Sequence, residues 1–261
     1  MYASLLINNG ARHRNPALEW LGPAVDREFN AKITDLDLFD DGVTVDLLAQ
    51  IVTFTATTSG SAGRYTAAAP LHVHGWIDWG NDGIWHPGDL ILNWSGYPGD
   101  GTWVLGDASV TVSVPFIAPP TPWPPMMWSR FRLDYAQNLE SPVGAATYGE
   151  VEDYLLGVPL AVAPLLTISN PSGTIAQLDW TYHTPNCWYQ VHKDSAPYFA
   201  PSGGTLQSTL PGLTLTTQFP TDVGSPLANN YYLIRALNCS VDTAVSNRVG
   251  EFDFTIVPGV P

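Results

Sequence analysis

Residues 109–116 read Ser-Val-Thr-Val-Ser-Val-Pro-Phe, an alternation of hydroxyl and apolar side chains. Because successive side chains of a β-strand point to opposite faces, this pattern predicts a strand with one buried and one exposed face. The same pattern recurs between Gly, Pro, Asn and Asp residues, at a spacing of about 8–12 residues. It is found at Val43–Thr55, Leu71–Asp78, Leu178–Tyr182, Trp188–His192, Tyr231–Asn238 and Glu251–Val257. Such a rhythm is typical of β-sandwiches, so the sequence predicts an all-β fold.

Composition narrows the functional classes. The 261 residues are 45% hydrophobic and include 10 Trp, which is enough apolar material for a packed core. The chain has only 10 Lys and Arg but 24 Asp and Glu. The resulting net charge of −14 argues against a nucleic-acid partner. The chain contains no apolar run of about 18 residues, so we expect no transmembrane helix.

Two β-sandwich domains in tandem are predicted. Residues 1–9 form an extended N-terminal strand before a first domain at residues 10–158, and residues 159–164 within the sequence GVPLAVAP form a linker. The second domain, at residues 165–261, has the strand pattern of a fibronectin type III or immunoglobulin-like sandwich, with Trp180 facing inward. Most of the acidic side chains belong to the first domain.

The two cysteines lie where the second domain should bring them together. Cys187 begins one predicted strand, and Cys239 ends the strand expected to be its antiparallel neighbour. We therefore expect a Cys187–Cys239 disulfide; the alternative is two free buried thiols in a cytosolic protein. Because disulfides persist in oxidising compartments, the bridge would indicate an extracellular or cell-surface location.

The segment DWGNDGIWHPGD, residues 78–89, resembles a calcium-binding loop. Calcium prefers six to eight oxygen ligands, which closely spaced carboxylates on a tight turn can supply. The predicted ligands are Asp78, Asp82, the carbonyl of Ile84 and Asp89, although Gly80 has no side-chain oxygen to offer. The alternative is a plain hairpin turn at Asp82.

A second acidic cluster is a weaker candidate for an ion site. It consists of Asp35, Asp37, Asp40 and Asp41, followed directly by a glycine. An exposed acidic loop is the alternative.

Several short motifs together resemble a known family. The sequence GEVEDY at residues 149–154 is preceded by WIDW at 76–79 and by RFR at 130–132. Further upstream lie GARH at 10–13 and DDGV at 40–43. In this order the motifs resemble the GEVED domain of large secreted and surface proteins of bacteria, over roughly residues 8–157. The resemblance implies a β-rich extracellular module and no established enzymatic activity.

The motif also suggests a set of ion pairs. In an extended chain Glu150 and Glu152 share one face, and so do Arg130 and Arg132. We expect the two pairs to meet across neighbouring strands as a structural ion-pair ladder. The alternative is two independent solvated edges.

These features favour a structural function. The chain has no GxSxG or HExxH motif and no phosphate-binding loop, so we expect no enzyme. The leading hypothesis is an extracellular structural or adhesive subunit with calcium-stabilised loops, which donates residues 1–9 to a neighbour and so forms a head-to-tail homopolymer. The alternative is a calcium-dependent carbohydrate-binding module, because five tryptophans crowd around the acidic loop. They are Trp76, Trp79, Trp85, Trp94 and Trp103.

Two sequons are candidates for attached glycans. Asn93 and Asn238 each begin an Asn-x-Ser triplet. The triplet also arises by chance, so each remains a candidate.

Overall fold

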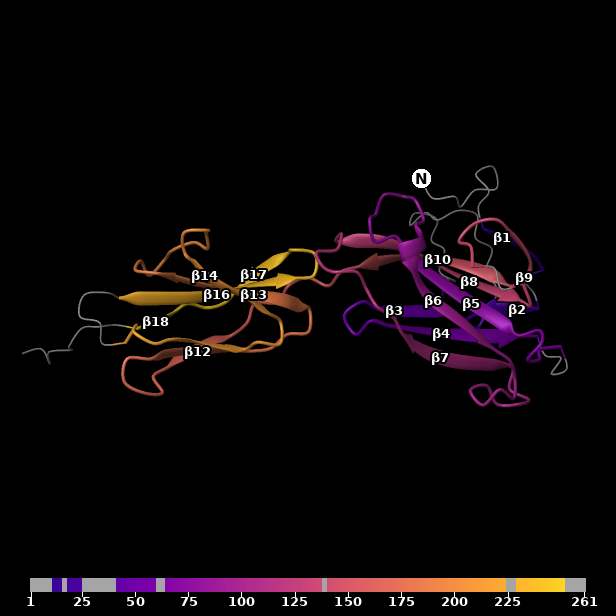
Figure 1. Ribbon diagram of the computed structural model, residues 1–261, viewed down its shortest axis with the longest axis horizontal. Coiled ribbons are helices and arrows are strands. Elements are labelled where there is room, and N and C mark those ends of the chain that lie inside the picture. The colour runs from indigo at the N-terminus through magenta and orange to yellow at the C-terminus, as the bar shows by residue number, and fades with distance from the viewer. Residues whose placement is uncertain are drawn as a thin grey trace, which may run out of the picture. The chain divides into compact units, whose positions relative to one another are not determined.

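The chain consists of two compact units. The computed structural model describes residues 11–15, 18–24, 41–59, 64–137, 140–223 and 229–251, so the predicted N-terminal strand at residues 1–9 lies outside the described residues. Unit 1 comprises Met1–Pro120 and Pro124–Gly157, and unit 2 comprises Thr121–Trp123 and Val158–Pro261. Both units are built almost entirely from β-strands (Figure 1), which confirms the all-β prediction. Within the described part of the chain, no helix is long and apolar enough to cross a membrane.

The first sheet of unit 1 is antiparallel and contains the GEVEDY strand at one edge, in the order β10-β8-β5-β6. Its strands are β5 (Leu71–Ile77), β6 (Leu90–Gly96), β8 (Met126–Tyr135) and β10 (Glu150–Gly157). The central strand β8 is buried on both faces over most of its length, so its polar residues Arg130 and Arg132 need partners inside the protein.

The second sheet of unit 1 is centred on β4 (Ile51–Thr58), with β7 (Ser109–Pro115) along one edge. The strands β2 (Glu19–Leu21) and β3 (Val43–Asp46) follow one another along the opposite edge of β4. Along β4 the apolar side chains are buried and the threonines between them are more exposed, as the alternating pattern predicted. The two sheets pack face to face, with Phe54 edge-on to Trp94 at 5.1 Å between ring centroids.

Two glycines join β2 and β3 at the level of Thr55. Gly22 donates its N–H to the Thr55 carbonyl (2.8 Å), and the Gly42 carbonyl accepts the Thr55 N–H (2.9 Å). A Cβ on Gly42 would lie 2.5 Å from the Gly22 nitrogen, and Gly22 has a φ of +70°. The residue after β2 and the residue before β3 approach each other so closely that only glycine fits at both positions. Strands β2 and β3 therefore act as one edge strand, interrupted by residues 23–41.

Unit 1 also contains a small parallel pair. Strand β1 (Arg12–Asn15) pairs with β9 (Ala145–Tyr148) in a two-stranded sheet. This pairing brings His13, from the start of the described chain, beside the segment that precedes the GEVEDY strand.

Unit 2 has the strand order of a fibronectin type III domain. One sheet has the order β11-β12-β15, and the other joins β14, β13 and β16, with β17 and β18 both pairing with β16. The first sheet contains β11 (Leu166–Ser169), β12 (Ala176–Trp180) and β15 (Thr216–Phe219). The second contains β13 (Asn186–Asp194), β14 (Leu206–Pro211), β16 (Asn230–Asn238), β17 (Thr243–Val245) and β18 (Val249–Glu251). Trp180 packs edge-on against Tyr189 in the core between the sheets, as its predicted inward position required.

The disulfide forms as predicted, between Cys187 in β13 and Cys239 just after β16. The register pairs Asn186 with Asn238, and the two cysteine Cα atoms are 5.3 Å apart. Antiparallel pairing of the two strands thus places the thiols within bonding reach.

Residues 159–164, which the sequence suggested as a linker, belong to unit 2. The Asn238 side chain donates to the Pro159 carbonyl (2.8 Å), and Asn186 exchanges two hydrogen bonds with the main chain of Val162. These side-chain amides fix the segment as part of the folded unit.

Removal of the disulfide tests its contribution to unit 2. The cysteines are 52 positions apart, and closing a loop of that length stabilises a fold by roughly 4 kcal/mol through the entropy of the unfolded chain. We expect the Cys187→Ala/Cys239→Ala variant to lose about this free energy of unfolding in a denaturant titration. A reducing agent should destabilise the wild type similarly and leave the variant unchanged. Equal stability of wild type and variant would show that the bridge has no such role.

Candidate functional site

The GEVEDY motif forms the start of the edge strand β10, and its glycine is required by geometry. Gly149 has a φ of +96°, and a Cβ at this position would lie 1.9 Å from the Leu133 carbonyl oxygen. Any other residue would collide with the backbone of β8. The close approach sets the register in which Glu150 lies opposite Leu133 and Asp153 opposite Arg130.

Two of the motif's carboxylates bind the backbone of the opposite sheet. Glu150 accepts the N–H of Leu21 at the end of β2 (2.8 Å), and Glu152 accepts the N–H of Gly42 just before β3 (3.3 Å). Both glutamates are buried. The pair therefore ties β10 to the interrupted edge strand of the second sheet, on either side of its break.

The tyrosine of the motif adds a third tie to the same edge. Tyr154 donates its hydroxyl to Glu152 (2.7 Å), and its oxygen accepts the N–H of Val43 in β3 (2.9 Å). Burial raises the pKa of Glu152 to about 8, with the charges of Glu150 and Asp41 acting in the same direction.

The aspartate of the motif points to the other face of the sheet and pairs with an arginine. Asp153 accepts two hydrogen bonds from Arg130, at 2.6 Å from Nε and 2.5 Å from Nη2. Arg130 is 1% exposed, so this is a bidentate ion pair inside the protein. Its remaining amino group donates to the Pro142 carbonyl (2.8 Å) and so fixes the loop before β9.

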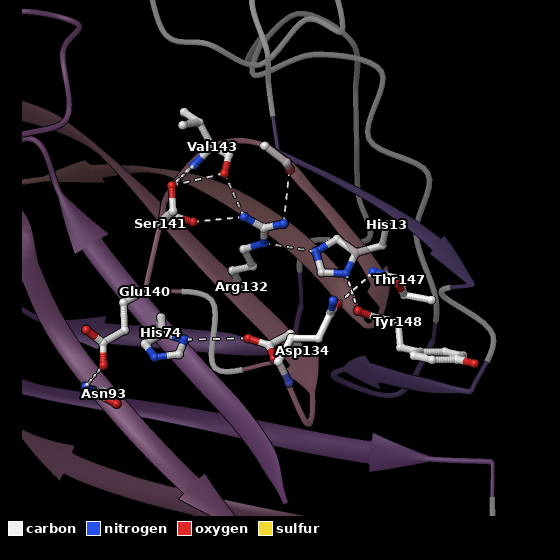
Figure 2. A network of polar contacts seen from close by, with 12 residues as sticks. His13, His74, Asn93, Arg132, Asp134, Glu140, Ser141, Val143, Thr147 and Tyr148 are labelled. Atoms are coloured by element: carbon white, nitrogen blue, oxygen red, sulfur yellow. Dashed lines mark hydrogen bonds and ion pairs between the residues drawn. The ribbon is translucent and has the colours of Figure 1, made fainter. Parts of the chain in front are cut away.

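The second arginine is surrounded by carbonyl oxygens (Figure 2). Arg132 donates to the carbonyls of Ser141 (2.9 Å), Val143 (3.0 Å) and Gly144 (3.0 Å). Its guanidinium thus shapes the turn at residues 141–144 from within.

His13 completes this cluster in its neutral form. The Nε of Arg132 donates to His13 Nε2 (3.2 Å), and His13 Nδ1 lies 2.5 Å from the Tyr148 carbonyl, so that Nδ1 carries the proton (Figure 2). Burial and the positive charge of Arg132 lower the pKa of His13 to about 3. The histidine is a structural acceptor here.

The predicted pairing of Arg130 and Arg132 with Glu150 and Glu152 is wrong. Each pair does share a face of its own strand, as predicted, but the register places Arg130 opposite Asp153 and Phe131 opposite Glu152. The arginines and the glutamates therefore lie on opposite faces of the sheet. Spacing within a strand could not reveal this, because a one-residue change in register exchanges the faces.

The acidic loop is organised by its own aspartates. Asp78 is fully buried and accepts the N–H groups of Asp82 (3.3 Å) and Gly83 (2.9 Å). Asp89 is also buried, accepts the N–H of His86 (2.7 Å), and has its pKa raised by burial and by the nearby charge of Asp78. These bonds make the tight turn that was the alternative to an ion site.

The predicted calcium ligands converge only in part. The carboxylates of Asp78 and Asp89 lie close enough to influence each other, whereas Asp82 faces His86 (3.0 Å) and the N–H of Ile84 (2.8 Å) at the surface. The Asp82–His86 hydrogen bond lowers the pKa of Asp82 and raises that of His86. Among the described residues, no group of three or more acidic, histidine or cysteine side chains forms a candidate metal cluster.

The second acidic cluster falls largely outside the described residues. Asp35, Asp37 and Asp40 lie there, while Asp41 is exposed beside the junction of Gly22 and Gly42.

The two sequons differ in accessibility. Asn93 is exposed on β6 and donates to Glu140 (3.1 Å). Asn238 is 2% exposed, and its carbonyl oxygen accepts the N–H groups of Ser240 and Asp242 while its amide nitrogen donates to Pro159. The expectation of a glycan at Asn238 is therefore wrong for the folded chain, because its acceptor nitrogen is enclosed in the fold.

The five tryptophans do not form one exposed surface. Trp103 is buried and donates to the Asp107 carbonyl (3.1 Å), and Trp94 packs on Phe54. Of the five, Trp76 and Trp85 line a pocket of unit 1, to which the end of the acidic loop also contributes. Most of this aromatic content therefore serves packing.

The fold and the buried motif define a protein of two β-sandwich units, and family comparison agrees with the predicted family for unit 1. Residues 72–157 match the model of the GEVED domain, so this part of the chain is a GEVED domain. The match covers β5 to β10 and thus includes Arg130, Arg132 and the GEVEDY strand. No curated protein matches the chain.

Similar solved structures are distant. Pectate lyase PelI from Erwinia chrysanthemi, in complex with tetragalacturonic acid, is 15% identical with a TM-score of 0.26, covering 34% of this chain and 27% of its own. Pectate lyase Pel3 from Pectobacterium carotovorum is 12% identical with a TM-score of 0.29, covering 37% of this chain and 28% of its own. The FN1–FN3 domains of chicken CNTN1 are 10% identical with a TM-score of 0.30, covering 77% of this chain and 59% of that one. The chain thus spans under a third of the pectate lyases, and the fibronectin type III assignment of unit 2 is carried by its own strand order.

The buried ion pair provides a stability test. Asp153→Asn leaves the charge of Arg130 buried without its carboxylate, which typically costs 3–5 kcal/mol. We expect a loss of about 3–5 kcal/mol in the free energy of unfolding, followed by tryptophan fluorescence in urea. Asp107→Asn, at an exposed position of the same unit, is the control and should change stability by less than about 0.5 kcal/mol. Equal effects of the two substitutions would show that Asp153 has no such structural role.

The raised pKa of Glu152 predicts that the stability of unit 1 depends on pH. Between its ordinary pKa of 4.5 and the folded value of about 8, the folded state keeps a proton that the unfolded state releases. The stability from this group is therefore present below about pH 4.5 and is lost as pH rises towards 8, by roughly 3–5 kcal/mol in total. Unfolding titrations from pH 5 to 9 should show this decline in the wild type and a flatter profile in Glu152→Gln. Parallel profiles would mean that Glu152 titrates normally.

Proposed function

We propose that the protein is an extracellular structural or adhesive subunit that assembles head-to-tail by strand donation and has no catalytic activity. The GEVED domain supports a secreted or surface setting, and the disulfide of unit 2 fits an oxidising compartment. The motif's acidic side chains support a structural role because they accept backbone and guanidinium hydrogen bonds in the interior.

One observation carries the assembly proposal: β7 is an uncharged edge strand. Residues Ser109–Pro115 read SVTVSVP, and within the described part of the chain β7 pairs with β4 alone. Natural edge strands are usually protected by charges, because an open row of N–H and C=O groups accepts another strand. The mostly apolar segment Tyr2–Ile7 carries no charged side chain and is one residue shorter than β7, and it is the proposed donated strand.

Deletion of residues 1–9 tests the donor, and Thr111→Lys tests the acceptor. Thr111 is exposed on β7, where a lysine should block strand addition; Thr44→Lys, on β3, is the matched control. In light scattering and negative-stain microscopy, we expect filaments from the wild type and Thr44→Lys, and monomers from the deletion and Thr111→Lys. Filaments from the deletion variant would refute strand donation by this segment.

Calcium is the second part of the proposal, at the loop of residues 78–89. The neighbouring carboxylates of Asp78 and Asp89 are the groups whose charge a divalent cation would neutralise. Calcium at 100 times its Kd should stabilise the wild type by about 2.7 kcal/mol relative to a chelator, raising Tm, with no response in Asp78→Asn. A Tm that is the same with calcium and with chelator would leave the loop as a plain turn.

A further inference from the structure

Unit 1 has a pocket beside the acidic loop of residues 78–89. It has a volume of about 360 Å³ and opens where the acidic loop, the start of β6 and the segment around Pro142 come together. Its lining residues are Trp76, Trp85, His86, Pro87, Leu90, Glu140 and Pro142. The volume lies at the lower end of the range for small-molecule sites.

The pocket's walls are held by the ion pair of the GEVEDY strand. The guanidinium carbon of Arg130 lies 5.6 Å from the centroid of the Trp85 ring, and Arg130 also donates to the Pro142 carbonyl. Asp153 holds that guanidinium with two hydrogen bonds. Two contributors to the wall, Trp85 and Pro142, are thus positioned by one buried side chain.

The second indole of the lining belongs to Trp76 in β5, beside an irregularity in the sheet. The pairing of β5 with β6 shifts register between Gly75 and Trp76. The Trp76 ring stacks on His74 at 5.9 Å between centroids, with an interplanar angle of 29°. The extra residue of this bulge lies in β6, and Trp76 contributes to the lining although it is almost fully buried.

Polar groups accompany the aromatic wall. Glu140 is exposed, and the amide of Asn93 donates to its carboxylate (3.1 Å), which positions the oxygens (Figure 2). His86, also exposed, supplies an imidazole from the acidic loop. The pocket therefore combines two indole rings with a carboxylate and an imidazole.

We propose that this pocket binds a neutral sugar residue of a glycan. A pyranose ring presents apolar C–H groups on its faces and hydroxyls at its edge, and an indole packs against the former while a carboxylate and an imidazole hydrogen-bond the latter. The carboxylate of Glu140 and the chain's net charge of −14 disfavour uronic acids and other anionic sugars. The site requires neither strand donation nor calcium, so it goes beyond the proposed assembly.

The test is binding of the full chain to a glycan array that carries neutral and uronic-acid glycans. We expect retention on a subset of neutral glycans and none on the uronic acids. Glu140→Gln and Trp85→Ala should each reduce the apparent affinity at least ten-fold. Trp188→Ala, at an exposed tryptophan of unit 2, is the matched control and should bind as the wild type does.

Two variants distinguish a loss of glycan binding from a loss of folding or of assembly. Because Trp85 also packs on Arg130, the decisive variant is Glu140→Gln, whose exposed side chain should leave Tm unchanged. Thr111→Lys should keep full glycan binding as a monomer, so failure of assembly and failure of binding are distinguishable. The proposal is overturned if no neutral glycan retains the wild type, if uronic acids bind better, or if Glu140→Gln binds equally well.

Discussion

The carboxylates at the start of β10 are the constraint on which the rest of unit 1 depends. A buried acidic side chain is tolerated only when charged or hydrogen-bonded partners replace its water or when it keeps its proton, as Glu152 does below about pH 8. Glu150 and Glu152 find theirs in backbone N–H groups of the opposite sheet, and Asp153 finds Arg130 on the other face. One strand therefore links both sheets and the loop before β9. This explains physically why the motif has acidic residues on both faces of the strand.

The sequence predicted what depends on local pattern. Alternation along residues such as 109–116 located the strands, and the places of Cys187 and Cys239 on neighbouring strands predicted the disulfide. It could not predict the partners of Arg130 and Arg132, because the register between β8 and β10 decides which faces meet. The role of Gly42 was equally hidden, since its contact with Gly22 joins segments on either side of a long insertion.

For the site residues too, local spacing predicted some features and not others. Asp78 and Asp89 were singled out by spacing, and both prove to be buried turn acceptors whose charges lie close together. The pocket beside them was not predicted, because Glu140 and Pro142 come from a distant segment that Arg130 brings into place. The acidic charge that dominates the composition is thus partly internal, and it organises both the sandwich and the pocket on its surface.

The most direct test of this account is native-state hydrogen exchange at the Leu21 and Gly42 amides, which donate to Glu150 and Glu152. If these carboxylates hold the two sheets together, both amides should exchange only through global unfolding of unit 1, with the same free energy as the amides of the central strand β8. Exchange of Leu21 and Gly42 through local opening, while β8 remains protected, would contradict the central role of the GEVEDY strand.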